Sequence, residues 1–242
     1  MAPLLRFQVL TVVPEPVHAY VHASILGRAE RAGVVQFDVV DLREFGEGRY
    51  KKLDDSPYGG GAGMVMKAPP VVRAIEEAQA RVSDRASSRT ILLSPAGRRL
   101  NRDIAAELAT CSDIILVCGR YEGVGARVSK FVDEELSVGD FVLTGGELAA
   151  LCVVDAVTRR LAGALGNETS AADESFESGL LEYPQYTRPE TFRGEPVPAV
   201  LRSGDHGAIG RWRREQALNR TRERRADLLP SESAIFREVG EK

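Results

Sequence analysis

The sequence has few of the residues that would mark a secreted or membrane protein. It contains only three cysteines, Cys111, Cys118 and Cys152, and an odd, sparse count argues against a disulfide framework. Cys118 and Cys152 lie in apolar runs and are predicted to be buried core thiols. The first residues have no basic segment followed by a cleavage site, and no apolar run approaches the length of a transmembrane helix. We therefore expect a soluble, cytoplasmic protein with no membrane partner.

Charge of one sign is also scarce over the chain as a whole, because the formal net charge is -3 for 242 residues. Residues 201–230 differ, since they contain eight arginines against four acidic residues. A local excess of positive charge attracts an anionic polymer even when the whole chain is acidic. The sequence therefore leaves a nucleic-acid partner open and places its binding surface near the C-terminus.

Short β-branched runs alternate with helical patterns in the first two thirds of the chain. The predicted strands are Leu4–Val13, Val34–Leu42, Thr90–Leu93, Asp113–Cys118 and Phe141–Leu143. The predicted helices are Glu15–Arg31, Pro70–Val82, Asn101–Thr110 and Glu147–Arg160. Alternation of this kind predicts an α/β domain with a mainly parallel sheet.

The composition of the sequence changes after Gly163. We expect residues 1–162 to form the α/β domain, 163–179 a flexible linker rich in Gly, Asn, Ser and Glu, and 180–242 a second, small domain. Four prolines exclude a long helix before Leu201, and residues 205–226 are predicted to be helical.

The segment SVGDFVLTGGELAA (137–150) resembles the strand, turn and helix of a phosphate-binding loop. It has neither GxxxxGK[ST] nor GxGxxG, and it places the carboxylate of Glu147 where a phosphate would be repelled. The glycine-rich run 59–63 is followed by Met64 where a phosphate-binding loop has lysine. Glycine turns follow three predicted strands, and ligands bind outside the carboxyl ends of strands in open α/β sheets. A nucleoside without phosphates fits these turns better than a nucleotide does.

The motifs as a set resemble the bacterial tRNA (guanine-N1)-methyltransferase family, TrmD, in the same order and over nearly the whole chain. They are DDSPYGGGAGMVM (54–66), SPAGRRL (94–100), CGRYEG (118–123), SVGDFVLTGGE (137–147), LGNETS (165–170), YTRPE (186–190), SGDH (203–206) and RWRREQALNRTRERRADLL (211–229). The resemblance implies a SPOUT-type parallel sheet with a C-terminal trefoil knot, followed by a small helical domain that binds tRNA. It also implies a homodimer with the active site at its interface.

The resemblance further implies S-adenosyl-L-methionine as the cofactor, bound by three loops. The matching positions are Ser94, Pro95 and Gly97 in the first loop, Gly119, Arg120 and Tyr121 in the second, and Val138, Gly139, Asp140, Phe141, Val142, Leu143, Gly145 and Gly146 in the third. Glu122, which follows the second loop, is a catalytic candidate. Phe141 stands where the family has a tyrosine. The implied substrate is a tRNA whose guanosine 37 follows another guanosine. The implied activity belongs to the EC 2.1.1 class.

The chemistry of such a transfer indicates which groups it needs. N1 of guanine carries a proton at neutral pH, so a general base must remove it, and a cation stabilises the negative charge that develops on O6. Arg159 matches the family's arginine. The family has Asp followed by Ser at the base position, whereas this chain reads Asp173-Glu174-Ser175. Glu174 falls on the base position by strict alignment, and Asp173 does so after a shift of one residue.

Two other functions stay open at this point. Another knotted methyltransferase would modify a different RNA nucleotide. A non-catalytic RNA-binding module would bind RNA without the cofactor, and the substitution of Glu for Asp at position 174 is the feature that favours it. The sequence contains no dedicated metal cluster, so Mg²⁺, which the family is reported to need, would have no protein site of its own.

Overall fold

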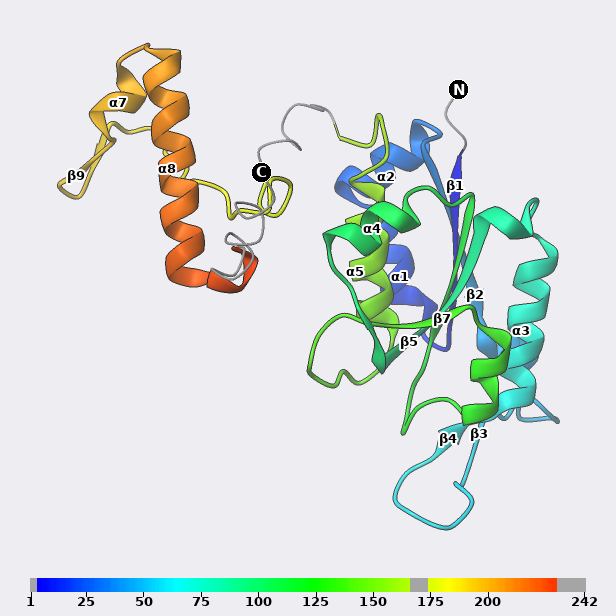
Figure 1. The fold of residues 1–242 in the computed structure, drawn as a ribbon. Helices are drawn as coiled ribbons and strands as arrows, with labels where there is room; N and C mark the ends of the chain where they lie inside the picture. The colour runs from blue at the N-terminus through cyan, green and yellow to red at the C-terminus, as the bar shows by residue number, and fades with distance from the viewer. Residues whose placement is uncertain (1–3, 166–173, 230–242) are drawn as a thin grey trace, which may run out of the picture. The chain divides into compact units, whose positions relative to one another are not determined.

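The computed structural model describes residues 4–165 and 174–229 (Figure 1). The chain divides into two compact units, Met1–Gly166 and Asn167–Lys242, and each unit is described by itself. The predicted domain boundaries stay predictions. None of the helices within the described ranges is long and apolar enough to cross a membrane.

The first unit is built on a five-stranded sheet in the order β2-β1-β6-β5-β7. Its strands are β1 (Leu5–Thr11), β2 (Val35–Asp41), β5 (Ser88–Arg99), β6 (Asp113–Cys118) and β7 (Glu134–Ser137). Every neighbouring pair in this sheet is parallel. The predicted α/β class with a parallel sheet is therefore confirmed. A separate two-stranded antiparallel ribbon joins β3 (Asp54–Asp55) to β4 (Val65–Met66).

Helices cover both faces of the sheet (Figure 1). One face carries α1 (Pro14–Val21), α2 (Ser24–Arg31), α4 (Arg102–Leu108) and α5 (Glu147–Thr158), and the other carries α3 (Ala68–Ala80) with the 3-10 helix η3 (Ala126–Phe131). Shorter 3-10 turns lie at Leu42–Phe45 and Arg85–Ser87. The two layers of helices leave the carboxyl ends of the central strands available to loops.

The central strand β6 shows why this sequence forms such a sheet. All six residues of DIILVC are buried. Successive side chains of a strand point to opposite faces: Ile114 and Leu116 pack in the core beside α1 and α5, whereas Ile115 and Val117 pack in the core beside α3. A continuous apolar run is the pattern of a strand covered on both faces, and its predicted bounds match those observed.

The predicted strand Phe141–Leu143 is wrong. These residues form a loop, and their exposed fractions are 56% for Phe141, 84% for Val142 and 36% for Leu143. The fifth strand is instead β7, whose sequence EELS has two acidic residues and lies at the edge of the sheet. Apolar character was the basis of the prediction, and here it marks the wall of a cavity instead of a buried strand.

Two further predictions need correction. The helix expected over Glu15–Arg31 is two helices, because the chain turns at Ser24, where φ is +47°. Gly27 permits the turn, since a Cβ there would lie 2.2 Å from the carbonyl oxygen of His22. Cys152, predicted to be buried, is exposed on α5, whereas Cys118 is buried as predicted.

Within residues 174–229, the second unit contains a hairpin and two α-helices. Their bounds are β8 (Thr191–Phe192), β9 (Glu195–Pro196), α7 (Ala199–Arg202) and α8 (His206–Arg224), followed by a 3-10 turn at Ala226–Leu228. The helix predicted over 205–226 is thus present as α8. Asp205 caps it, because its carboxylate accepts a hydrogen bond of 2.9 Å from the backbone N–H of Ala208. Trp212 of α8 packs against Tyr186, with 6.3 Å between ring centroids.

Candidate functional site

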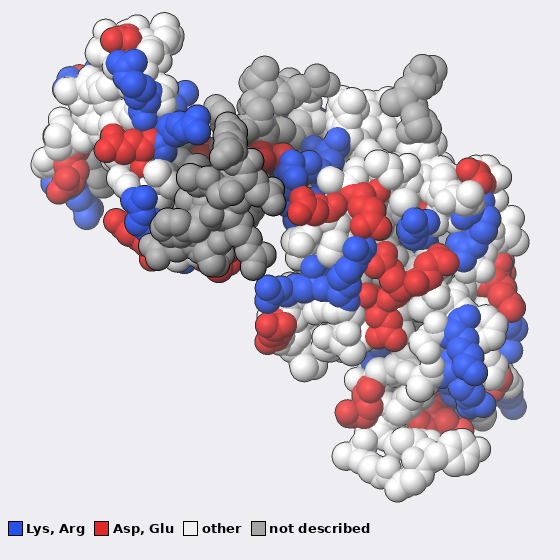
Figure 2. Space-filling view, in the orientation of Figure 1, with Lys and Arg blue, Asp and Glu red and all other residues white. Residues whose placement is uncertain are grey.

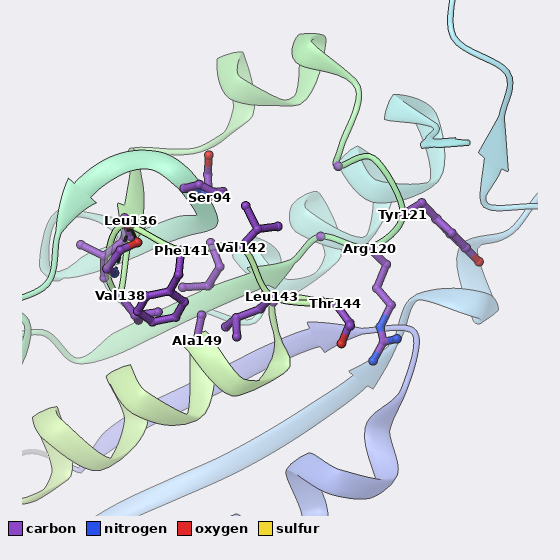
Figure 3. A pocket seen from close by; sticks show the side chains of 18 of the residues that line it. Ser94, Arg120, Tyr121, Leu136, Val138, Phe141, Val142, Leu143, Thr144 and Ala149 are labelled. Atoms are coloured by element: carbon purple, nitrogen blue, oxygen red, sulfur yellow. Dashed lines mark hydrogen bonds between the residues drawn. The ribbon is translucent and has the colours of Figure 1, made fainter. Parts of the chain in front are cut away.

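A cavity of about 220 Å³ lies at the carboxyl ends of β6 and β7 and beside the middle of β5, which stands between them in the sheet (Figure 3). Its walls come from three segments, one within β5, one after β6 and one between β7 and α5. The lining residues are Leu93, Ser94, Pro95, Gly119, Arg120, Tyr121, Glu122, Gly123, Leu136, Ser137, Val138, Gly139, Phe141, Val142, Leu143, Thr144, Gly145, Gly146 and Ala149.

The cavity brings together all but two of the residues predicted to hold the cofactor. The exceptions are Gly97 and Asp140, which are not part of its lining. Sequence reasoning did not assign six lining residues to the site, although each stands close in the sequence to a predicted site residue: Leu93, Gly123, Leu136, Ser137, Thr144 and Ala149. Their proximity to the motifs was the signal that could have identified them.

The first wall segment is a four-residue excursion within one strand. Leu93 and Arg98 of β5 both pair with Leu136 of β7, so the residues between them leave the sheet. Gly97 explains why the excursion can return so tightly. A Cβ at this position would lie 2.3 Å from the backbone nitrogen of Leu136, so the close approach of β5 to β7 requires glycine.

A second close approach joins the other two wall segments. The backbone N–H of Gly146 donates a hydrogen bond of 2.8 Å to the carbonyl oxygen of Gly119. A Cβ on Gly146 would lie 2.8 Å from the Cα of Cys118, which is closer than two carbon atoms can pack. The glycine pair 145–146 therefore serves a backbone contact between loops.

Glu147 is a buried residue that connects the segments around the site. Its side chain is 5% exposed, and its Oε1 accepts hydrogen bonds from Thr11 Oγ1 at 2.7 Å and from Arg120 Nε at 3.2 Å. The positive charge of Arg120 compensates the buried carboxylate. The arrangement ties the end of β1 and the loop after β6 to the start of α5. Neither Thr11 nor Glu147 was predicted from the sequence as a site residue.

The buried thiol beneath the cavity is chemically inert. Burial, and secondarily the negative charge of Glu147, raises the pKa of Cys118 well above its ordinary value. The thiol therefore stays protonated at neutral pH, and a protonated thiol is a poor nucleophile. Covalent catalysis through Cys118 is not supported by this geometry.

Glu122 is held against the glycine-rich segment that precedes β4. Its backbone N–H donates to the carbonyl oxygen of Met64 at 2.9 Å. A Cβ on Gly63, where φ is +79°, would lie 2.4 Å from Glu122 Oε1. The segment 56–66 has no charged residue, and it forms the white region at the bottom of Figure 2. Glu122 is thus an acid that lines the cavity next to an uncharged loop.

Two other predicted catalytic residues, Arg159 and Glu174, are not part of the lining of the cavity. Arg159 follows the last residue of α5, whereas the first turn of that helix borders the cavity. Twelve residues at 1.5 Å each separate the two ends by about 18 Å, which is longer than an arginine side chain. Glu174 belongs to the second unit, and Asp173 lies outside the described residues.

The chemistry of the cavity suits a flat, uncharged ring system. Its walls combine backbone N–H and C=O groups at glycines with the apolar side chains of Val138, Phe141 and Leu143. Apolar walls with a few placed polar groups are typical of small-molecule sites. Over residues 4–165 and 174–229, no group of three or more His, Cys, Asp or Glu side chains is arranged to hold a metal ion.

Comparison with known proteins gives a consistent result. A family model described as tRNA (Guanine-1)-methyltransferase TrmD matches residues 5–231. A protein of Anaeromyxobacter sp. (strain Fw109-5) is 56% identical over 231 residues, which cover 95% of this chain and 92% of that protein. A protein of Myxococcus xanthus is 54% identical over 229 residues, 94% of this chain and 92% of that one. One of Halalkalibacterium halodurans is 51% identical over 226 residues, 93% and 91% respectively. Each of these relatives is named tRNA (guanine-N(1)-)-methyltransferase.

Proposed function

Because the chain belongs to the tRNA (guanine-1)-methyltransferase TrmD family, we propose that it transfers a methyl group from S-adenosyl-L-methionine to N1 of guanosine 37 in tRNA. The observation that carries the proposal is the cavity between β5 and the ends of β6 and β7, whose walls contain most of the residues that the family resemblance assigns to the cofactor. The reaction belongs to the EC 2.1.1 class, and the expected compartment is the cytoplasm.

The donor set of the cavity fits a nucleoside without phosphates. The loop backbone around the cavity suits hydrogen bonds to an adenine and a ribose, and Phe141 offers a ring against which the adenine can pack. Glu147 occupies the start of α5, where a phosphate-binding site would leave the helix N-terminus open to the anion. The bound cofactor supplies an electrophilic methyl group.

The protein's own residues have two tasks in the reaction. Either Glu174 or Asp173 removes the proton from N1 of guanine, and Glu174 is our first choice because it aligns with the family's base. Arg159 stabilises the negative charge that develops on O6. Glu122 lines the cavity and is a further catalytic candidate. Mg²⁺, where it assists, would act without a dedicated protein site.

The position of Arg159 supports an active site made from two chains. About 18 Å of helix separates this residue from the end of α5 that borders the cavity. Two copies with their α5 helices antiparallel would bring the arginine of one copy to the cavity of the other. We therefore propose a homodimer, with the wall segments of the cavity folded as a trefoil knot as the family resemblance implies.

The second unit supplies the charge for tRNA binding. Helix α8 contains six arginines and two glutamates, so it attracts the phosphate backbone, and its contribution to affinity should fall as salt rises. The guanine base would be read through its Watson–Crick edge after it leaves the loop stack. A guanosine at position 36 is the expected preceding nucleotide.

Methyl transfer to defined transcripts tests the proposal. The full-length protein is incubated with labelled S-adenosyl-L-methionine and a tRNA transcript that has guanosine at positions 36 and 37. Matched transcripts carry adenosine at one position or the other. Incorporation should require guanosine 37, and mapping should place the label on N1. Equal incorporation without guanosine 37 would indicate a methyltransferase with another RNA target, and binding of RNA without cofactor would indicate a non-catalytic module.

A further inference from the structure

The hairpin of β8 and β9 is a tight structure with a defined tip. Phe192 pairs with Glu195 across the two strands. The two residues between them both have positive φ, +51° for Arg193 and +88° for Gly194. Two successive left-handed residues are the mark of a type I′ turn, the turn that best matches the twist of a two-residue hairpin. The backbone at the tip is thus set by its own local geometry.

The base of the hairpin is fastened to the chain that follows it. The backbone N–H of Val197 donates a hydrogen bond of 2.8 Å to the carbonyl oxygen of Glu190, and the Glu190 carboxylate pairs with Arg202 of α7. The hairpin lies next to α7 in Figure 1, where its second strand is labelled β9. Its tip is presented to solvent from a base that this backbone bond closes and that Glu190 ties to α7.

The tip carries an aromatic ring that the described residues of the unit leave largely exposed. Phe192 is 64% exposed, and the guanidinium carbon of Arg193 lies 5.4 Å from the centroid of its ring. Within residues 174–229 the other aromatic rings have partners in or after α8: Tyr183 lies under Arg213, Tyr186 packs on Trp212, and Phe176 lies near the guanidinium of Arg225. The ring of Phe192 has a cation near one face and solvent over much of the rest, which is unfavourable for an apolar group.

We propose that the hairpin tip is a stacking site for an unpaired nucleotide of the tRNA, with the base on the ring of Phe192 and Arg193 beside it. The inference rests on the proposed function, because that function supplies the RNA. Proteins bind unpaired RNA bases by stacking them on aromatic rings and guanidinium planes. The arginines of α8 supply the charge that attracts the backbone, and the hairpin adds a contact that is independent of charge.

The test compares tRNA affinity of the full-length wild-type protein with that of Phe192→Ala at several salt concentrations. Loss of a stacked base is worth about 1–3 kcal/mol, so the substitution should weaken binding about 5- to 150-fold. The slope of affinity against salt should not change, because the ring has no charge. Phe192→Tyr should retain the affinity. Arg193→Ala should lower the slope of log affinity against log salt concentration by at most about the contribution of one phosphate contact.

A matched control is Phe131→Ala in the first unit, where the ring is 43% exposed and no role in tRNA binding is assigned. It should leave tRNA affinity unchanged. Transcripts that lack the base of one unpaired nucleotide identify the stacked base. Removing the base that stacks on Phe192 should weaken binding to the wild-type protein and should not weaken binding to Phe192→Ala.

Three outcomes would overturn the inference. Unchanged tRNA affinity of Phe192→Ala shows that the ring does not stack, and the proposed function survives if the wild-type protein still methylates its transcript. Dissociation of the oligomer by this substitution, measured by sedimentation, identifies a surface between protein chains. Weaker binding of both tRNA and S-adenosyl-L-methionine shows a general defect. A wild-type protein that neither binds nor methylates tRNA rejects the proposed function itself.

Discussion

The hydroxyl of Thr11 donates a hydrogen bond of 2.7 Å to the carboxylate of Glu147, across 136 residues of sequence. The same oxygen accepts from Arg120. The contact places the end of β1, the loop after β6 and the start of α5 around one buried charge. Since two of these segments form walls of the cavity, the affinity for the cofactor should depend on a residue that does not touch it.

Glu147→Gln tests that dependence. The amide keeps the shape of the side chain but removes the charge that pairs with Arg120, so the unfolding free energy should fall by about 1–3 kcal/mol. The affinity for S-adenosyl-L-methionine, measured by calorimetry on folded protein, should fall as well. Glu77→Gln is the control, because Glu77 pairs with Arg81 on an exposed helix face, where such a pair contributes little. Equal effects of the two substitutions would contradict the role of Glu147.

Gly146→Ala should disturb the cavity without unfolding the protein. The added methyl group would meet the Cα of Cys118 and the nitrogen of Gly119, and such overpacking costs about 1–3 kcal/mol. We expect the dissociation constant for the cofactor to rise about 5- to 150-fold, and tRNA binding by α8 to stay. Gly210→Ala is a suitable comparison, because a Cβ at Gly210 meets nothing within 4 Å. Unchanged cofactor affinity of Gly146→Ala would show that the two loops can separate at little cost.

The identity of the general base can be decided by single-turnover rates. A positioned base contributes about 10²- to 10⁴-fold, so Glu174→Gln should slow methyl transfer by that factor while the affinities for cofactor and tRNA hold. Asp173→Asn should have the smaller effect. The reverse order of the two rates would assign the proton transfer to Asp173 and require the alignment to shift by one residue.

Mixed dimers test whether Arg159 acts on the partner's cavity. Arg159→Ala and Gly146→Ala chains carry their defects at opposite ends of α5. In the proposed homodimer, random pairing makes half of the dimers mixed, each with one intact site. At a cofactor concentration too low to fill the Gly146→Ala cavity, about a quarter of the wild-type rate should therefore return. The rate is measured on co-expressed chains with different tags, after the mixed species is verified. A verified mixed dimer that stays inactive would show that each chain serves its own site.

The sequence predicts some elements well because their pattern of apolar and polar residues is compatible with only one type of structure. β6 is a continuous apolar run between polar residues, and it forms a strand with the predicted bounds. α5 was likewise predicted, two residues too long. Phe141–Leu143 has the same apolar character as β6 but borders a cavity, and local sequence does not distinguish these two environments.

The role of Glu147 was beyond sequence reasoning for a different reason. An acid at the first position of a helix is expected from the helix dipole alone. Its buried partners, Thr11 and Arg120, become visible only when β1, β6 and α5 have been brought together by the fold. Motifs identified the cavity's walls, and tertiary structure was needed to find what holds them.

The double pairing of Leu136 places a constraint on how this protein can vary. The excursion of β5 leaves the sheet beside Leu136 and returns beside the same residue, so its length is set by geometry at both ends. Gly97 within it must stay glycine because of the close approach to Leu136, and a deletion of one residue would turn Arg98 and Arg99 each to the face of the sheet opposite its present one. Relatives with insertions or deletions should therefore carry them elsewhere, for example in the segment between β3 and β4.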